Sequence, residues 1–115
     1  MIDNSNPIVK LSFEFALDII EFAELLESNR KFVIAKQLLK SGTSIGANVH
    51  EAQNAESKTD FIHKIKIAAK EADETGYWLS LCDFSKSYPD CKELIEKNNV
   101  LLRILNKIIG TSKKN

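Results

Sequence analysis

A regular helical spacing runs through the most glycine-rich part of this sequence, and it constrains the fold more than any other feature. Core-type positions lie alternately four and three residues apart, the spacing that keeps one face of an α-helix against a neighbouring helix. These positions are Ile34, Leu38, Ser41, Ile45, Asn48, Ala52 and Ala55. The spacing predicts a helix over residues 31–55, although the segment SGTSIGA within it has the composition of a loop.

A glycine-rich loop that binds phosphate is the alternative interpretation of the same segment. Such loops follow a strand and carry the pattern GxxxxGK[ST] or GxGxxG, and neither pattern is present. We therefore expect Gly42 and Gly46 to allow a close approach of the next helix, near Ile65–Lys70. Each glycine costs about 1 kcal/mol relative to alanine inside a helix, so closer contact must offset that cost.

Three further segments show helical spacing, and none shows the alternation of a strand. Asn6 and Pro7 mark a helix start, and Ser57 with Asp60 resembles a capping box. The sequence thus predicts an all-α protein, an antiparallel up-down four-helix bundle, with residues 1–115 as a single domain. The predicted helices cover about residues 7–27, 31–55, 58–86 and 91–109, followed by a polar tail over residues 110–115.

Polar side chains accompany the predicted contact between the second and third helices. If these helices form a hairpin that turns near Glu56, Ser41 lies opposite Glu71. A buried polar network can fix the register or the oligomeric state of a bundle. The predicted members are Ser41, Asn48, Glu51, Lys70, Glu71 and Glu74. Nearby, Tyr77 and Trp78 point in different directions from one helix, and one of them is a candidate anchor for a subunit interface.

The sequence offers little for catalysis or for binding a metal ion. HEAQN begins like a zinc-protease helix, but Asn54 stands where HExxH requires histidine. His50 and His63 are candidate neighbours near the hairpin turn, without further ligands. Cys82 and Cys91 are expected to be reduced thiols, although they could meet across the connection between the last two helices. We therefore predict no catalytic, cofactor or metal site and no small-molecule substrate, and rank a metal-dependent enzyme built on Glu51, Glu71, Glu74 and a histidine last.

Charge is balanced overall but unevenly distributed. The formal net charge is zero, which argues against a strong non-specific nucleic-acid binder. Residues 1–29 hold six acids and one base, whereas residues 30–50 hold four bases and no acid. We expect Arg30, Lys31 or Lys36 to meet Asp18, Glu21 or Glu24 within or between subunits. The candidate contacts to RNA or DNA are Arg30, Lys31, Lys36, Lys40, Lys113 and Lys114.

Several stretches together resemble a known bacterial family. SNPIVKLSFEFAL, SGTSIGANVHEA, KEADETGYWL and LLRILNKIIGTSKK are similar to the four-helix-bundle proteins encoded in intervening sequences of 23S ribosomal RNA genes. The resemblance covers about residues 5–112. One departure is Lys40, where the family often has arginine, so a bidentate contact made by that arginine would be weakened or lost.

The resemblance implies an all-helical bundle that assembles as a homo-oligomeric ring, with pentamers known among relatives. A related accessory protein of diversity-generating retroelements binds nucleic acid, and no enzyme activity is established for the family. We therefore expect a non-enzymatic interaction scaffold, with a nucleic-acid-binding accessory protein as the alternative. The sequence has no membrane-length apolar run and no signal peptide, so a cytoplasmic protein is expected.

Overall fold

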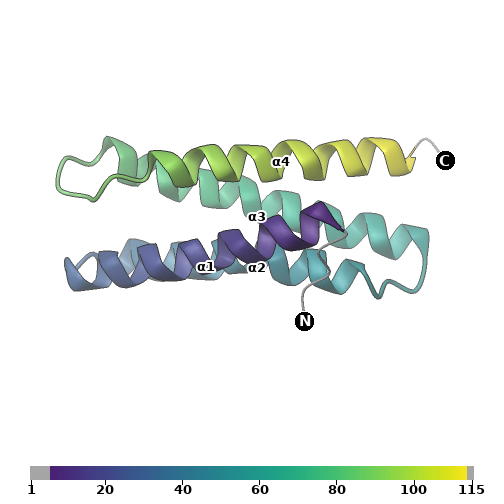
Figure 1. The fold of residues 1–115 in the computed structure, drawn as a ribbon, viewed down its shortest axis with the longest axis horizontal. Helices are drawn as coiled ribbons and strands as arrows, with labels where there is room; N and C mark the ends of the chain where they lie inside the picture. The colour runs from purple at the N-terminus through teal and green to yellow at the C-terminus, as the bar shows by residue number, and fades with distance from the viewer. Residues whose placement is uncertain (1–5, 114–115) are drawn as a thin grey trace.

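Four long helices make up the computed structural model, which describes residues 6–113 (Figure 1). They are α1 (Pro7–Ser28), α2 (Phe32–Ala52), α3 (Lys58–Phe84) and α4 (Lys92–Lys113). No strand occurs among the described residues. The bundle is elongated, with principal extents of 47 × 27 × 21 Å. The predicted all-α, four-helix fold class is thus confirmed.

Consecutive helices run in opposite directions, and Figure 1 shows the chain turning back at each connection. Glu51 of α2 pairs with Lys64 of α3, whereas Ser41, earlier in α2, contacts Thr75, later in α3. The α1–α2 pair is also antiparallel, because Gly46 lies against Ser12 and the earlier Gly42 lies against the later Ile19. So is the α3–α4 pair, in which Ala72 contacts Asn98 and the later Asp83 contacts the earlier Lys92. Within residues 6–113, the backbone of α1 runs next to those of α2 and α4 and farther from that of α3, so α1 and α3 are diagonal in the bundle.

The helix ends follow local capping chemistry in some places and depart from the prediction in others. Pro7 opens α1, and the Ser57 hydroxyl accepts a hydrogen bond from the Asp60 N–H at 3.0 Å, as the capping pattern predicted. The side chain of Asn6 makes no capping hydrogen bond to α1, and its amide donates to Gln53 Oε1 at 3.1 Å. The second helix ends at Ala52 rather than near residue 55. The fourth continues to Lys113, so residues 110–113 are helical and not part of a polar tail.

The turn between α1 and α2 places a non-glycine residue in the left-handed region. Arg30 has a φ of 64°. The N–H of Lys31 donates to the Leu26 carbonyl at 2.8 Å, and the N–H of Arg30 donates to the Glu27 carbonyl at 2.9 Å. These two bonds define a Schellman motif, which usually has glycine at the position that Arg30 occupies. This backbone conformation costs about 1 kcal/mol for arginine and is free of that strain for glycine.

The core lies along the bundle axis and draws on all four helices. Its largest fully buried side chains include Phe15 and Ile19 of α1, Leu38 and Ile45 of α2, Leu79 of α3, and Leu101 and Leu105 of α4. A buried polar residue, Asn98 of α4, lies among them. Its amide donates to the Ala72 carbonyl at 2.9 Å, and its Oδ1 has no hydrogen-bond partner among the described residues. The apolar spacing in the sequence thus matches the buried faces of the helices.

The glycines of α2 pack against α1, and the prediction that they face α3 is wrong. A Cβ at Gly42 would lie 2.8 Å from both γ carbons of Ile19, and a Cβ at Gly46 would lie 3.1 Å from the carbonyl oxygen of Ser12. Both distances are shorter than ordinary van der Waals contact. The small residues therefore do allow two helix backbones to approach closely, but the second helix is α1.

Candidate interaction surfaces

A pair of buried hydroxyl groups links α2 to α3. Thr75 Oγ1 lies 2.9 Å from Ser41 Oγ and 2.8 Å from the carbonyl oxygen of Glu71, and both hydroxyl-bearing side chains are fully buried. The predicted partner of Ser41 was Glu71, one helical turn earlier. The predicted register is wrong by one turn: the pairs Ser41–Thr75 and Glu51–Lys64 show that the first turns of α3 extend past the end of α2. Ser41 and Thr75 thus form a local polar contact inside an apolar core.

The other residues of the predicted network lie outside the core. Asn48 is half-buried and donates to the Ser44 carbonyl of its own helix at 2.8 Å. Glu51 is exposed and pairs with Lys64 at 3.2 Å. Lys70 and Glu74 are exposed, and Glu71 is half-buried. Partial burial and repulsion by Glu74 raise the pKa of the Glu71 carboxyl. A connected, buried six-residue network does not form.

The two adjacent aromatic residues of α3 have different environments. Trp78 is half-buried against the core and its indole N–H donates to Glu74 at 3.3 Å, whereas Tyr77 is 59% exposed. The two rings meet edge to face, with centroids 5.2 Å apart. Tyr77 is therefore the one of the pair that is free to contact another molecule.

Two stripes of exposed apolar side chains lie on diagonal helices. The α1 stripe consists of Phe13, Leu17 and Ile20, and the α3 stripe consists of Tyr77, Leu81 and Phe84. Both stripes have the same spacing of four and three residues, so each forms one line along its helix. Leu17 is 50% exposed and Phe84 is 87% exposed. Large apolar side chains grouped in this way are typical of surfaces that bind another protein.

The predicted basic contacts are divided between the two ends of the bundle. Arg30, Lys36 and Lys40 are exposed on the turn and the first half of α2. Lys31 lies over the Tyr88 ring, with its ammonium 5.2 Å from the ring centroid. Lys113 is at the opposite end, where a side-chain hydrogen bond with Lys66 and the charge of Lys113 lower the pKa of Lys66. Lys114 lies outside the described residues. These cations do not form one patch on a single chain.

The predicted ion pairs between the start of α2 and α1 are absent within residues 6–113. Asp18 instead pairs with Lys97 of α4 at 2.8 Å, and Lys97 also pairs with Glu93 at 3.2 Å. These bonds raise the pKa of the Lys97 ammonium. A contact between the α2 cations and Glu21 or Glu24 of a second subunit stays a prediction.

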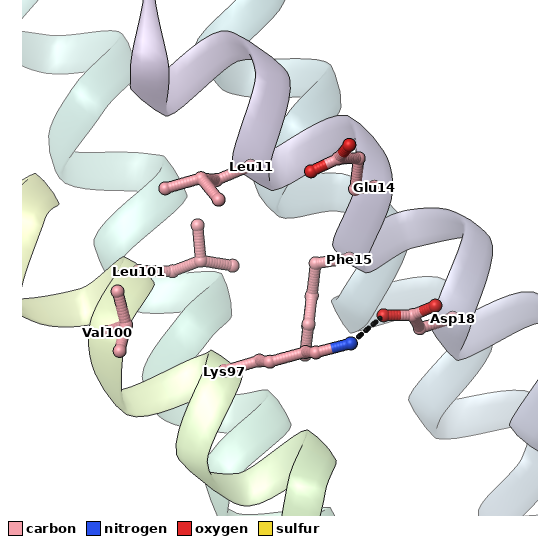
Figure 2. Close-up of a pocket in the computed structure, with 7 residues that line it drawn as sticks. All are labelled: Leu11, Glu14, Phe15, Asp18, Lys97, Val100 and Leu101. Carbon is pink, nitrogen blue, oxygen red and sulfur yellow. Dashed lines mark hydrogen bonds and ion pairs between the residues drawn. The ribbon is translucent and has the colours of Figure 1, made fainter.

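An apolar groove runs between α1 and α4, which meet less closely than the other neighbouring helices. Leu11, Phe15, Val100 and Leu101 line a cavity of about 270 Å³ in it. Figure 2 shows the Lys97 side chain crossing from α4 to Asp18 at one end of this cavity. Beyond that ion pair, a second cavity of about 370 Å³ continues along the same two helices past Phe22, Leu25 and Leu94. The sequence pattern gave no indication of this groove.

Both cysteines are buried near the connection between α3 and α4. Burial raises the pKa of the Cys82 thiol to about 12 and that of the Cys91 thiol to about 11. Cys91 Sγ lies 3.4 Å from the Leu79 carbonyl oxygen. Both are free thiols, as the sequence predicted, and they are protonated at neutral pH.

His50 and His63, the candidate metal ligands, are both exposed. Among the described residues, no group of three or more histidine, cysteine, aspartate or glutamate side chains is arranged to hold a metal ion. No helix in residues 6–113 is long and apolar enough to cross a membrane.

Comparison with known proteins identifies the family. Residues 4–107 match the family described as 23S rRNA-intervening sequence protein. The chain belongs to this family. A crystal structure of a member of the S23 ribosomal protein family from Bacteroides thetaiotaomicron VPI-5482, a protein with unknown function, has the same fold, with a TM-score of 0.85 and 40% sequence identity. The match covers 89% of this chain and 97% of the other. No curated protein matches the chain.

Proposed function

We propose that this member of the 23S rRNA-intervening sequence protein family is a non-enzymatic interaction scaffold of the cytoplasm. In this proposal, copies of the chain assemble head to tail into a ring, with five copies as the family resemblance implies. The observation that carries the proposal is the pair of exposed apolar stripes on α1 and α3.

The position of the stripes favours a head-to-tail contact over a two-fold one. Because α1 and α3 are diagonal in the bundle, the two stripes cannot cover each other within one molecule. A two-fold dimer that pairs one stripe with its own copy would leave the other stripe exposed to water. A contact between the α1 stripe of one copy and the α3 stripe of the next covers both, and such heterologous contacts close into rings when the rotation allows.

Light scattering tests this proposal directly. We expect the wild-type chain to have a mass several times its 13.0 kDa at micromolar concentration. Leu17→Glu in the α1 stripe and Leu81→Glu in the α3 stripe should each yield a monomer, because either change places a charge in the contact. Leu25→Glu is the matched control, since Leu25 is a similarly exposed leucine of α1 outside the stripe. A monomeric wild-type chain would refute the proposal.

Nucleic-acid binding is the second candidate function. Its support is the exposure of Arg30, Lys36 and Lys40, which form no ion pair with another described residue. A ring would repeat this set in every copy and thereby multiply a modest local charge. We expect binding of a labelled single-stranded RNA at about 50 mM salt, with affinity that falls steeply as salt rises. Lys36→Glu with Lys40→Glu should abolish it, and Lys107→Glu with Arg103→Glu on α4 should not. Equal loss in both pairs would indicate a non-specific charge effect.

A further inference from the structure

We propose that the groove between α1 and α4 binds a basic, apolar-faced helix of a partner protein. The groove is separate from the α1 and α3 stripes, so this inference does not depend on ring formation. Its solvent-exposed apolar side chains are Leu11 and Val100 at one end and Leu25 at the other, and they stand beside the buried Phe15 and Phe22. A partner that covers these exposed side chains removes apolar surface from water.

The rim of the groove carries a strong excess of negative charge. The carboxylates of Glu14, Asp18, Glu21, Asp90 and Glu93 line it, and Lys97 is the one cation among the lining residues. Lys97 is already paired with two of the five carboxylates, whereas the other three have no ion pair with a described residue. Charge complementarity therefore selects an occupant with lysine or arginine beside its apolar residues. The same rim would repel the phosphates of nucleic acid or of an anionic membrane.

The walls of the groove favour a helix over an extended peptide. An extended peptide binds well at a sheet edge because unpaired backbone N–H and C=O groups there can bond to it. The backbone groups of α1 and α4 are already hydrogen-bonded within each helix, so the groove offers no such partners. A helix satisfies its own backbone and can lay an apolar face between two antiparallel helices. The lining runs along α1 from Leu11 to Leu25, about 21 Å at the rise of an α-helix. This length accepts about four turns of a docked helix.

Direct binding of defined peptides tests this inference on the full chain. The probes are fluorescein-labelled helical peptides of about 16 residues, with leucine, isoleucine or phenylalanine along one face and lysine on both sides of it. The control peptides keep the apolar face and replace every lysine with glutamate. We expect saturable binding of at least one lysine peptide by fluorescence anisotropy, and none of the glutamate peptides.

Matched variants locate the binding on the protein. Glu14→Lys with Glu93→Lys reverses one exposed rim charge on each helix of the groove, and we expect it to weaken binding at least tenfold. Glu27→Lys with Glu96→Lys makes the same change in net charge on the same two helices, away from the groove, and should leave the affinity within about twofold. Val100→Ser, which removes apolar surface from the cavity, should also weaken binding.

Four outcomes would overturn the inference. They are no saturable binding of any lysine peptide, equal binding of the glutamate peptides, equal loss in the two charge-reversed pairs, and a change in oligomeric mass caused by the groove variants. The last outcome would make the groove a contact between copies of this chain. A monomeric wild-type chain that still bound the lysine peptides would refute the ring and leave this inference intact.

Discussion

Because α1 and α2 pack closely at Gly42, we expect Gly42→Ala to destabilise the protein, whereas a glycine-to-alanine change inside a helix usually stabilises it. Alanine is favoured over glycine inside a helix by about 1 kcal/mol. At Gly42, however, the new Cβ would lie 2.8 Å from both γ carbons of Ile19, whereas carbon atoms in contact are about 3.5–4.0 Å apart. Ile19 is fully buried, so its side chain cannot move into solvent. Overpacking of this kind costs about 1–3 kcal/mol, and with two contacts this short we take the upper part of that range.

The net expectation is a loss of about 1–2 kcal/mol in the free energy of unfolding. Gly110→Ala is the matched control, because Gly110 is also helical and a Cβ there would meet no atom within 4 Å apart from its own helix backbone and chain neighbours. It should be neutral or stabilise by up to about 1 kcal/mol, less as the helix end frays. Equilibrium urea unfolding, followed by circular dichroism at one fixed protein concentration, measures both variants. If Gly42→Ala stabilised the protein as much as Gly110→Ala, the tight contact between α1 and α2 would be refuted.

Three other predictions follow from the same structure. Thr75→Val should lower the free energy of unfolding by about 1–3 kcal/mol, because it leaves the buried Ser41 hydroxyl without its partner. Ser41→Ala should lower it by about 1 kcal/mol, since Thr75 keeps its contact with the Glu71 carbonyl. Equal losses in urea unfolding would contradict this asymmetry. Arg30→Gly should raise the free energy of unfolding by about 1 kcal/mol, because glycine adopts a φ of 64° without strain, and a destabilised variant would argue against the Schellman motif. The unfolded thiols ionise near their ordinary pKa of 9.0, whereas the folded ones keep their protons to a pKa of about 11 for Cys91 and about 12 for Cys82. The unfolded state therefore binds fewer protons above pH 9.0, so stability should fall as the pH rises from there toward 11, and a Cys82→Ala, Cys91→Ala chain should lose that part of the pH dependence.

The helical core could be predicted from the sequence because its spacing is strict. Ile65, Ala72, Thr75 and Leu79 of α3 have helical spacing in the sequence, and all four are buried. The glycine-rich part of α2 is helical for the same reason: Leu38, Ile45 and Ala52 keep the line through it and are buried. Periodicity of this kind depends only on the geometry of a single helix, so it can be recognised without knowing which helices pack against each other.

Relations between helices could not be predicted in the same way. Ser41 and Gly42 are adjacent, so they point about 100° apart, and one faces α3 while the other faces α1. The sequence shows that both are small and does not show which neighbour each meets. The register of the hairpin was wrong by one turn because it depends on the path of the chain over residues 53–57.

The candidate surfaces were predicted only in part. Of the two candidate interface aromatics, Tyr77 is the exposed one, but Leu81 and Phe84 join it in a stripe that is recognised only once the outer face of α3 is known. The α1–α4 groove joins residues far apart in the chain, such as Asp18 and Lys97. No local pattern marks such a pair, and the weak packing of α1 against α4 follows from the arrangement of all four helices.

Mixing two stripe variants tests the head-to-tail contact most directly. Leu17→Glu disables the α1 stripe and keeps the α3 stripe intact, while Leu81→Glu does the reverse. Each variant alone should be a monomer of about 13 kDa. An equimolar mixture should form a dimer with twice that mass, because one complementary pair of stripes remains and no ring can close. A mixture that stays monomeric, or one variant that assembles fully by itself, would contradict the account.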